Sequence, residues 1–317
     1  FYILKDKIIS DICIKKLMQL LVYILVYPII WLISILPFRV LYIKSSFISF
    51  IFYYIIGYRK KMVLDNLKIA FPEKSGKELK SIRRKFYRHF VDVFMEMIKS
   101  FTISKKTLAK HYKYTNIELF DELYKDGKSI VLVGSHYANW EWIIGLSAHV
   151  KYKSYAAFTR VNNKYFNKKV LNSREKFGAK FIKTSSIIST MDKNNKENIQ
   201  SLYGLLSDQS PQLKKTHYWS EFFGVKVPIH TGAEMLAKKY NMNVVYIHTK
   251  KVKRGYYETT FELITDDVKK YSNYELSDVF LRKTEQQILQ KPEHYFWTHN
   301  RFKHKDKYEE FLKSYNK

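Results

Sequence analysis

The sequence contains a single cysteine, Cys13, and it lacks the motifs that commonly carry enzyme nucleophiles or metal ions. One cysteine cannot form an intramolecular disulfide or a cysteine metal cluster. There is no HExxH motif, no convincing Gly-x-Ser-x-Gly turn and no cysteine in a catalytic setting. These absences argue against zinc-peptidase and serine- or cysteine-nucleophile chemistry. The lack of a second cysteine also favours a cytosolic face for the main part of the chain.

Acidic residues are scarce. The chain has 29 Asp and Glu against 56 Lys and Arg, which gives a net charge of +27. This excess favours anionic partners such as lipid head groups, a phosphorylated glycolipid or an acidic carrier protein. Ten of the basic residues are arginine, so a compositional preference for lysine explains the charge equally well. Nucleic acid is a poorer partner, because no zinc finger, Arg-rich arm or recognition motif is found.

Charge is also missing from residues 17–37, an apolar stretch interrupted by Pro28. This stretch is long enough to span a hydrocarbon core, and Trp31 suits a membrane interface. The second apolar stretch, residues 40–58, contains Lys44 and is expected to be interfacial. A buried core helix is the alternative for the first stretch. We expect residues 1–58 to be a membrane anchor and residues 59–317 a cytoplasmic catalytic domain.

The remainder of the chain alternates between helical and strand patterns. Ser75 and Glu78 predict a capping box for a helix that runs to about residue 101. The alternation predicts an α/β fold with a mixed, partly parallel sheet flanked by helices. Residues 209–228 are expected to be irregular. The expected strands are 129–134, 153–158, 179–183, 201–207, 243–250 and 256–264, and the expected helices are 139–149, 163–177, 186–199, 231–240 and 275–290.

The most informative stretch is residues 129–145. An apolar run ends at Gly134 and Ser135, His136 follows, and Glu141 stands in the first turn of an expected helix. Two helical residues at this spacing would point about 140° apart. If His136 instead precedes the helix, Glu141 can fold back onto the ring and hold one nitrogen, leaving the other nitrogen as a base. We therefore interpret His136 and Glu141 as a catalytic pair.

Several blocks in the same order carry a family resemblance. The chain resembles the bacterial lipid A late acyltransferases, of lauroyl and myristoyl type, within the lysophospholipid acyltransferase superfamily, whose signature is His-x4-Asp/Glu. The resemblance extends from about residue 17 to about residue 305. The blocks are His136-x4-Glu141, Asn66-Leu67, Phe71-Pro72-Glu73, Arg160-x-Asn-Asn163, Arg174-Glu-Lys-Phe-Gly178-Ala, Asp208-Gln209, Phe222-Phe-Gly224, Thr231-Gly232-Ala233 and Trp297-Thr-His299-Asn-Arg301-Phe-Lys303.

The resemblance implies a glycerol-3-phosphate acyltransferase-like fold with an N-terminal membrane helix. It also implies a membrane-bound O-acyltransferase of lipopolysaccharide biosynthesis at the inner membrane. Such an enzyme moves a fatty acyl chain from acyl-carrier protein to a hydroxyl of a lipid A precursor, with His136 as general base and Glu141 orienting it. Attack of a positioned hydroxyl on a thioester requires no metal, cofactor or enzyme nucleophile.

Five further residues are expected to bind substrate. Arg160 follows an expected strand and suits an anionic group, and Arg301 suits phosphate or carboxylate. Asn163 is a weaker companion of Arg160 in substrate binding, or else a cap for the following helix. Asp208 and Gln209 end an apolar run, where α/β sites gather, so they support the site, bind the acceptor or cap a turn. The alternatives are the same chemistry on a lysophospholipid, amino-acid lipid or glycolipid, and a non-catalytic protein that binds anionic lipids.

Overall fold

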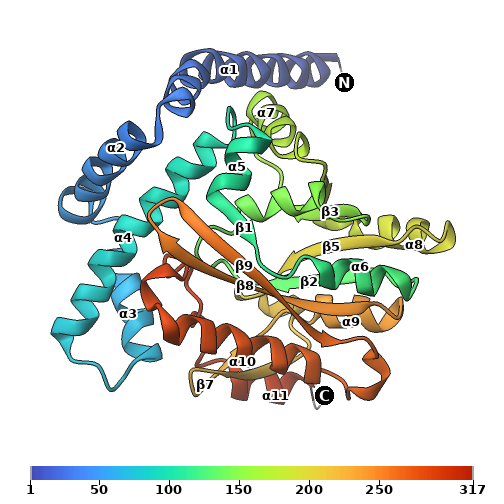
Figure 1. The fold of residues 1–317 in the computed structure, drawn as a ribbon. Coiled ribbons are helices and arrows are strands. Elements are labelled where there is room, and N and C mark those ends of the chain that lie inside the picture. Colours follow the sequence, from blue (N-terminus) through green and yellow to red (C-terminus); the bar gives the residue numbers. More distant parts are fainter. Residues whose placement is uncertain (1, 316–317) are drawn as a thin grey trace.

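The structure, a computed structural model, describes residues 2–315 and the side chains of residues 14–313. The side chain of Cys13 therefore lies outside the described residues. Figure 1 shows a central sheet with helices packed around it, and with α1 and α2 along the upper and left margins.

One seven-stranded sheet forms the centre, in the order β1-β9-β8-β2-β5-β3-β4. Neighbouring strands are parallel except for the hairpin of β8 and β9. The predicted mixed α/β class with a partly parallel sheet is confirmed. The strands are β1 (Tyr112–Tyr114), β2 (Ile130–Gly134), β3 (Lys153–Phe158), β4 (Lys180–Lys183), β5 (Ser201–Leu206), β8 (Asn243–Lys253) and β9 (Tyr256–Thr265).

Helices cover both faces of this sheet, and the alternation of side chains along β2 shows how. Val131 and Val133 belong to the larger core cluster, together with residues of α8, α9 and α10. Ile130 and Leu132 face the other way and join a second cluster with α6. The helices in these two layers are α6 (Glu118–Lys125), α8 (Ile187–Lys196), α9 (Gly232–Lys239) and α10 (Glu275–Gln290).

The helix predicted from Ser75 is α4 (Gly76–Lys99), and its capping box is present. The Glu78 backbone N–H donates to Ser75 Oγ at 3.3 Å, and the Ser75 N–H donates to Glu78 Oε2 at 2.8 Å. The remaining elements are α3 (Lys60–Ala70), α5 (Lys105–His111), α7 (Lys164–Glu175) and α11 (Tyr308–Tyr315), with short helices η3 (Thr184–Ser186), η4 (Leu213–Lys215), η5 (Val268–Lys270) and η6 (Pro292–His294).

Two predictions of local structure were wrong. Residues 209–228 contain an antiparallel hairpin, β6 (Trp219–Phe222) and β7 (Val225–Pro228), joined by Phe223 and Gly224. Both turn residues have positive φ, 51° and 70°, and this suits a two-residue hairpin turn although phenylalanine seldom occupies one. The helix expected over 139–149 is a short 3₁₀ helix, η2 (Trp142–Ala148).

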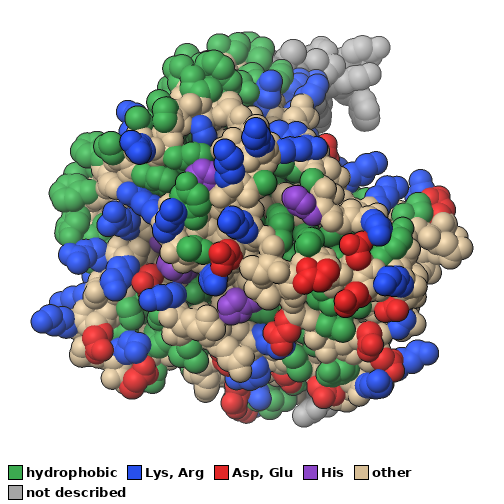
Figure 2. Space-filling model, in the orientation of Figure 1, with side chains coloured by type: hydrophobic (Ala, Val, Ile, Leu, Met, Phe, Trp, Pro, Cys, Tyr) green, Lys and Arg blue, Asp and Glu red, His purple; other side chains and the backbone are tan. Residues whose placement is uncertain are grey.

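The N-terminal segment consists of α1 (Tyr2–Ile35), α2 (Phe38–Phe50) and the π-helix η1 (Ile51–Ile56). The helical stretches Ile14–Ile35 and Phe38–Ile56 are both long and apolar enough to cross a membrane. Figure 2 shows hydrophobic side chains gathered over α1 and α2, with lysines and arginines beside them. Large hydrophobic residues exposed here include Leu17, Met18, Leu21, Leu25, Ile29, Leu32, Ile43, Phe47 and Ile55.

One stripe of α1 packs against the body of the protein. The Gln19 side chain donates to the Asn162 carbonyl, and the Gln19 carbonyl accepts from the Asn163 side chain. The Tyr23 ring lies 5.6 Å from that of Tyr165 in α7, and the Tyr27 ring lies 6.1 Å from that of Phe101. The spacing of these residues is that of one helix face. In the described part of α1, the other faces do not pack against the protein, and their hydrophobic side chains are exposed.

Candidate active site

The site begins where β2 and β5 end. These neighbouring parallel strands are in register, with Gly134 opposite Leu206. His136 and Asp208 each follow two residues later, so the two side chains leave the same edge of the sheet. The carboxyl ends of parallel strands are the usual place for reactive groups in α/β folds.

His136 Nδ1 lies 2.7 Å from Asp208 Oδ1. The Asp208 side chain is 1% exposed, whereas the His136 side chain is 20% exposed. Burial would raise the pKa of Asp208, but the charge and hydrogen bonds of His136 outweigh burial and hold that pKa below its ordinary value. An ionised Asp208 accepts a hydrogen bond from Nδ1–H, and in this arrangement a neutral His136 carries its lone pair on Nε2.

The predicted contact between Glu141 and the ring is corrected. Both carboxylate oxygens of Glu141 accept from Arg174 of α7, at 2.5 Å from Nε and 2.8 Å from Nη2. The chain between His136 and Glu141 is not helical, because Ala138 has φ of +51° and η2 begins only at Trp142. Glu141 is consequently directed toward α7, and the carboxylate on the ring comes from the neighbouring strand.

The segment 135–141, which we call the histidine loop, is held in place by residues 294–296 from the C-terminal part of the chain. The N–H of Ala138 donates to the His294 carbonyl at 3.0 Å, and the N–H of Phe296 donates to the His136 carbonyl at 3.1 Å. The Phe296 ring also lies 5.9 Å from the imidazole. The position of His136 is thus fixed by backbone contacts as well as by Asp208.

A cavity of about 650 Å³ opens beside this ring. His136, Gln209 and the Glu141–Arg174 pair line it, and Gln209 Nε2 lies 3.5 Å from His136 Nε2. Most of the other lining side chains are apolar. They are Leu132, Trp140, Ile143, Ile144, Leu146, Tyr155, Ala156, Ala157, Phe158, Ala179, Phe181, Ile187, Leu202, Leu205, Leu206, Ala233, Leu236 and Ile247. The cavity therefore offers polar groups at His136 and an apolar interior.

The other expected substrate-binding residues occupy different settings. Arg160 is exposed, just past the carboxyl end of β3 and on the same edge of the sheet as His136. The Asn163 side chain caps α7 by accepting from Tyr165 N–H at 3.0 Å, and it donates to the Gln19 carbonyl. The capping interpretation of Asn163 is confirmed. Neither residue lines the cavity.

Arg301 is 1% exposed and also lies outside the cavity wall. Its Nη1 donates to the Pro228 carbonyl at 3.1 Å, and its guanidinium lies 5.0 Å from the centre of the Phe222 ring. These contacts join the β6–β7 hairpin to the C-terminal segment. Arg301 is therefore buried between these two segments and does not offer its side chain to an anion at the protein surface.

Other blocks of the sequence motif meet in the same region. Asn66 Nδ2 donates to the carbonyls of Trp297 and His299, at 2.9 and 2.8 Å. Phe71 packs on Trp297 and Phe223, with ring centres 6.0 and 5.5 Å apart. These residues hold the segment that in turn holds the histidine loop.

His299 provides a test of this support through pH. Its Nε2 accepts the Ser210 N–H at 2.9 Å, and burial lowers the pKa of His299 from 6.5 to about 4. Since the unfolded chain takes up a proton first, stability is full above pH 6.5 and falls as pH drops toward 4. We expect His299→Gln to remove on the order of 1–2 kcal/mol of the loss between pH 7 and 5. Thermal unfolding of the parent and of His299→Gln at the two pH values measures this difference. An equal loss of stability between pH 7 and pH 5 in both proteins would contradict the prediction.

Sequence reasoning missed Arg174 as a site residue and did not pair Asp208 with His136. Arg174 stood in a recognised block, and its position on an expected helix gave no sign that it faces Glu141. Asp208 was expected to support the site or bind the acceptor. Its pairing depends on β5 lying beside β2, which local sequence does not encode.

Comparison with known proteins gives one result. A family model for bacterial lipid A biosynthesis acyltransferases matches residues 13–304. A search of curated proteins found no match. The matched range includes α2, the whole seven-stranded sheet, the His136–Asp208 pair and the segment 294–296 that holds the histidine loop.

Proposed function

Because the chain belongs to the bacterial lipid A biosynthesis acyltransferases, we propose that it transfers a fatty acyl chain from acyl-carrier protein to a hydroxyl of a lipid A precursor. The single observation that carries the proposed mechanism is the His136–Asp208 pair at the wall of an apolar cavity. A carboxylate-supported imidazole is a general base, and the cavity suits a hydrocarbon chain.

The proposed reaction uses His136 twice. Nε2 takes the proton of the acceptor hydroxyl as its oxygen attacks the thioester carbonyl carbon. The tetrahedral adduct then expels the carrier thiolate, the C–S bond breaks, and the imidazolium returns the proton to sulfur. Asp208, 2.7 Å from Nδ1, stabilises the imidazolium between the two steps. An ester and a free thiol are the products.

The apolar interior of the cavity is the proposed site of the acyl chain. Most of its residues come from η2, β3 and β5, and others come from β4, β8, α8 and α9. Burying a chain there removes it from water at about 0.8 kcal/mol per CH₂. The thioester end of the chain would then lie at His136, where the wall is polar.

The donor is proposed to dock through basic surface. Arg160 is exposed on the edge of the sheet that carries His136. An arginine there can pair with the phosphate of the carrier's prosthetic group or with a glycolipid phosphate. The net charge of +27 favours approach of an acidic carrier in either case.

Membrane binding is proposed to use the exposed apolar surface of α1, α2 and η1, at the inner membrane with the catalytic part facing the cytoplasm. Family membership associates the chain with membranes. The exposed hydrophobic residues are flanked by basic side chains (Figure 2), and this combination suits a bilayer with anionic lipids. We propose a division at residue 58 between the anchor and the catalytic part. The two parts are in contact, because Leu41 and Tyr53 pack into the main core.

Charged residues on the exposed side of α1 are expected to weaken membrane binding. Leu25 and Ile29 are 70% and 58% exposed. Burying each in lipid contributes roughly 1.5–3 kcal/mol, so Leu25→Glu with Ile29→Glu is expected to lower the vesicle partition coefficient by about 10²-fold or more. Flotation with anionic vesicles measures it. The control is Leu263→Glu with Val252→Glu, on exposed positions of β8 and β9, and equal losses in both pairs would contradict the proposal.

The function is tested by incubating the purified protein with labelled acyl-carrier proteins of several chain lengths and with candidate acceptors. A lipid A precursor is expected to be acylated on a hydroxyl, and lauroyl and myristoyl donors are expected to be preferred. Preference for a lysophospholipid, an amino-acid lipid or another glycolipid would assign a different acceptor. Lipid binding without transfer to any acceptor would favour a non-catalytic lipid-binding protein.

A further inference from the structure

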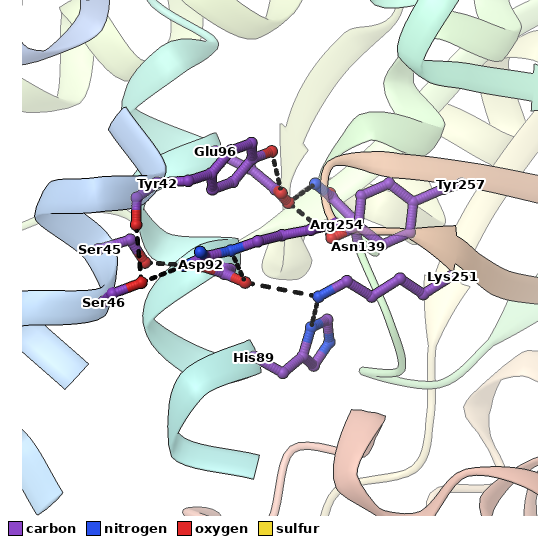
Figure 3. Close-up of polar contacts among 10 residues, drawn as sticks. All are labelled: Tyr42, Ser45, Ser46, His89, Asp92, Glu96, Asn139, Lys251, Arg254 and Tyr257. Carbon is purple, nitrogen blue, oxygen red and sulfur yellow. Dashed lines mark hydrogen bonds and ion pairs between the residues drawn. The ribbon is translucent and has the colours of Figure 1, made fainter. Parts of the chain in front are cut away.

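A buried carboxylate outside the catalytic pair contacts the histidine loop. Glu96 of α4 is 0% exposed. Its Oε1 accepts from the Tyr42 hydroxyl at 2.7 Å, and its Oε2 accepts from Tyr257 at 2.8 Å and from Asn139 Nδ2 at 2.7 Å. Figure 3 shows these side chains converging on Glu96 from α2, from β9 and from the loop that follows β2.

Asn139 transmits this contact to the loop. Its Oδ1 accepts the backbone N–H of Trp142 at 2.9 Å, which fixes the amide so that Nδ2 faces Glu96. The Trp142 indole N–H bonds to the Glu96 carbonyl at 3.3 Å and to Ser100 Oγ at 3.0 Å. The loop is therefore bound to α4 immediately after its strained residue, Ala138, whose φ is +51°.

We propose that Glu96 is a positioning residue for His136, holding the histidine loop through Asn139 so that the imidazole stays at the cavity wall. The proposal rests on the acyl transfer proposed above. The contacts at His294 and Phe296 hold the loop from one side, and Glu96 holds it from the other. Without the second support, Ala138 could relax its backbone and carry His136 away from Asp208.

A neighbouring carboxylate has a different task. Asp92 lies one turn earlier in α4, 1% exposed, and binds Arg254, Lys251 and Ser45 (Figure 3). These partners belong to α2 and the β8–β9 hairpin. Asp92 thus joins α4 to the same neighbours as Glu96 does, but its hydrogen bonds and ion pairs do not include the histidine loop. The difference makes Asp92 a matched control.

The expected kinetic result is a loss in kcat without a change in KM. Glu96→Ala removes the acceptor of Asn139, and misplacing a catalytic group by about 1 Å lowers turnover by up to roughly 10²-fold. Glu96→Gln keeps one oxygen for Asn139 and Tyr257, and its amide can donate to the Tyr42 hydroxyl oxygen. We expect Glu96→Gln to recover most of the activity. Asp92→Ala is expected to lower the melting temperature and keep kcat.

Hydrogen exchange gives a readout that does not depend on turnover. Backbone amides of residues 136–142 are expected to exchange at least about 10-fold faster in Glu96→Ala, and to be unchanged in Asp92→Ala and Glu96→Gln. If Glu96→Ala does not fold, Asn139→Ala tests the same contact from the loop. In that case the expected loss in kcat and in protection is similar.

Two outcomes overturn the inference. One is that Glu96→Ala or its substitute Asn139→Ala retains parental kcat and loop protection. The other is that Asp92→Ala loses as much kcat and loop protection as the Glu96 variant. A parent protein that transfers no acyl chain would contradict the proposed function alone, since the exchange experiment still decides whether Glu96 holds the loop.

Discussion

Replacing His136 with alanine is expected to lower kcat for acyl transfer by about 10²–10⁴-fold, the usual contribution of a positioned general base. The reason lies in the pair with Asp208, which leaves Nε2 as the unprotonated nitrogen beside the cavity. A neutral alcohol is a weak nucleophile, and the transition state loses its proton acceptor when the imidazole is removed. Binding of the acyl chain, which depends on the apolar wall, is expected to persist.

The measurement is the steady-state rate with labelled acyl-carrier protein, together with the KM for each substrate. His217→Ala is the matched control, because His217 is exposed and outside the cavity wall. Free imidazole added to His136→Ala is expected to restore part of the rate, as a diffusible base would. Unchanged turnover in His136→Ala would remove the base from the mechanism and leave cavity binding as the supported activity.

The strands that carry the site were predictable because their signals are local. The apolar run before Gly134 and the run over residues 201–207 each predict a buried strand, and both strands occur within one residue of the expected bounds. Reactive residues after such strands follow from a general property of α/β sheets. The positions of His136 and Asp208 at the sheet edge could therefore be predicted from the sequence.

The pairing of the site residues was not predictable, because it depends on strand order and on backbone conformations that the local sequence does not favour. Asp208 meets His136 because β5 lies beside β2. Glu141 turns away because Ala138 adopts a positive φ that alanine seldom takes. Long-range contacts hold that conformation, and none of them can be read from the spacing of His136 and Glu141.

The N-terminal segment also makes contacts with the rest of the protein that its composition does not predict. Its apolar runs indicate a membrane contact, and the exposed residues of α1 and α2 agree with that indication. Composition does not indicate that Tyr42 of α2 completes the hydrogen bonds of a buried carboxylate in α4. An added Cβ at Gly255 would overlap the Tyr42 hydroxyl, so the β8–β9 turn approaches α2 closely as well. The segment expected to be an anchor therefore also packs against the rest of the protein.

Substituting the amide for the carboxylate at one position at a time can identify which carboxylate accepts the hydrogen bond of the His136 ring. Asp208→Asn keeps the size of the side chain and replaces an acceptor with an amide. The amide N–H would donate to Nδ1 and favour the ring tautomer that is protonated at Nε2, which is the wrong form for a base. We expect kcat to fall by up to about 10⁴-fold, with the fold retained and KM little changed.

The ring tautomer separates Asp208 from Glu141 directly. Nitrogen chemical shifts of a labelled His136 ring are expected to report protonation at Nδ1 in the parent and in Glu141→Gln, and at Nε2 in Asp208→Asn. Glu141→Gln disturbs the contact with Arg174 instead. Asp192→Asn is the charge-matched control, because Asp192 is a surface partner of Lys239 and Tyr240. If the shifts of His136 moved in Glu141→Gln and not in Asp208→Asn, the carboxylate on the ring would be that of Glu141, as the spacing first indicated.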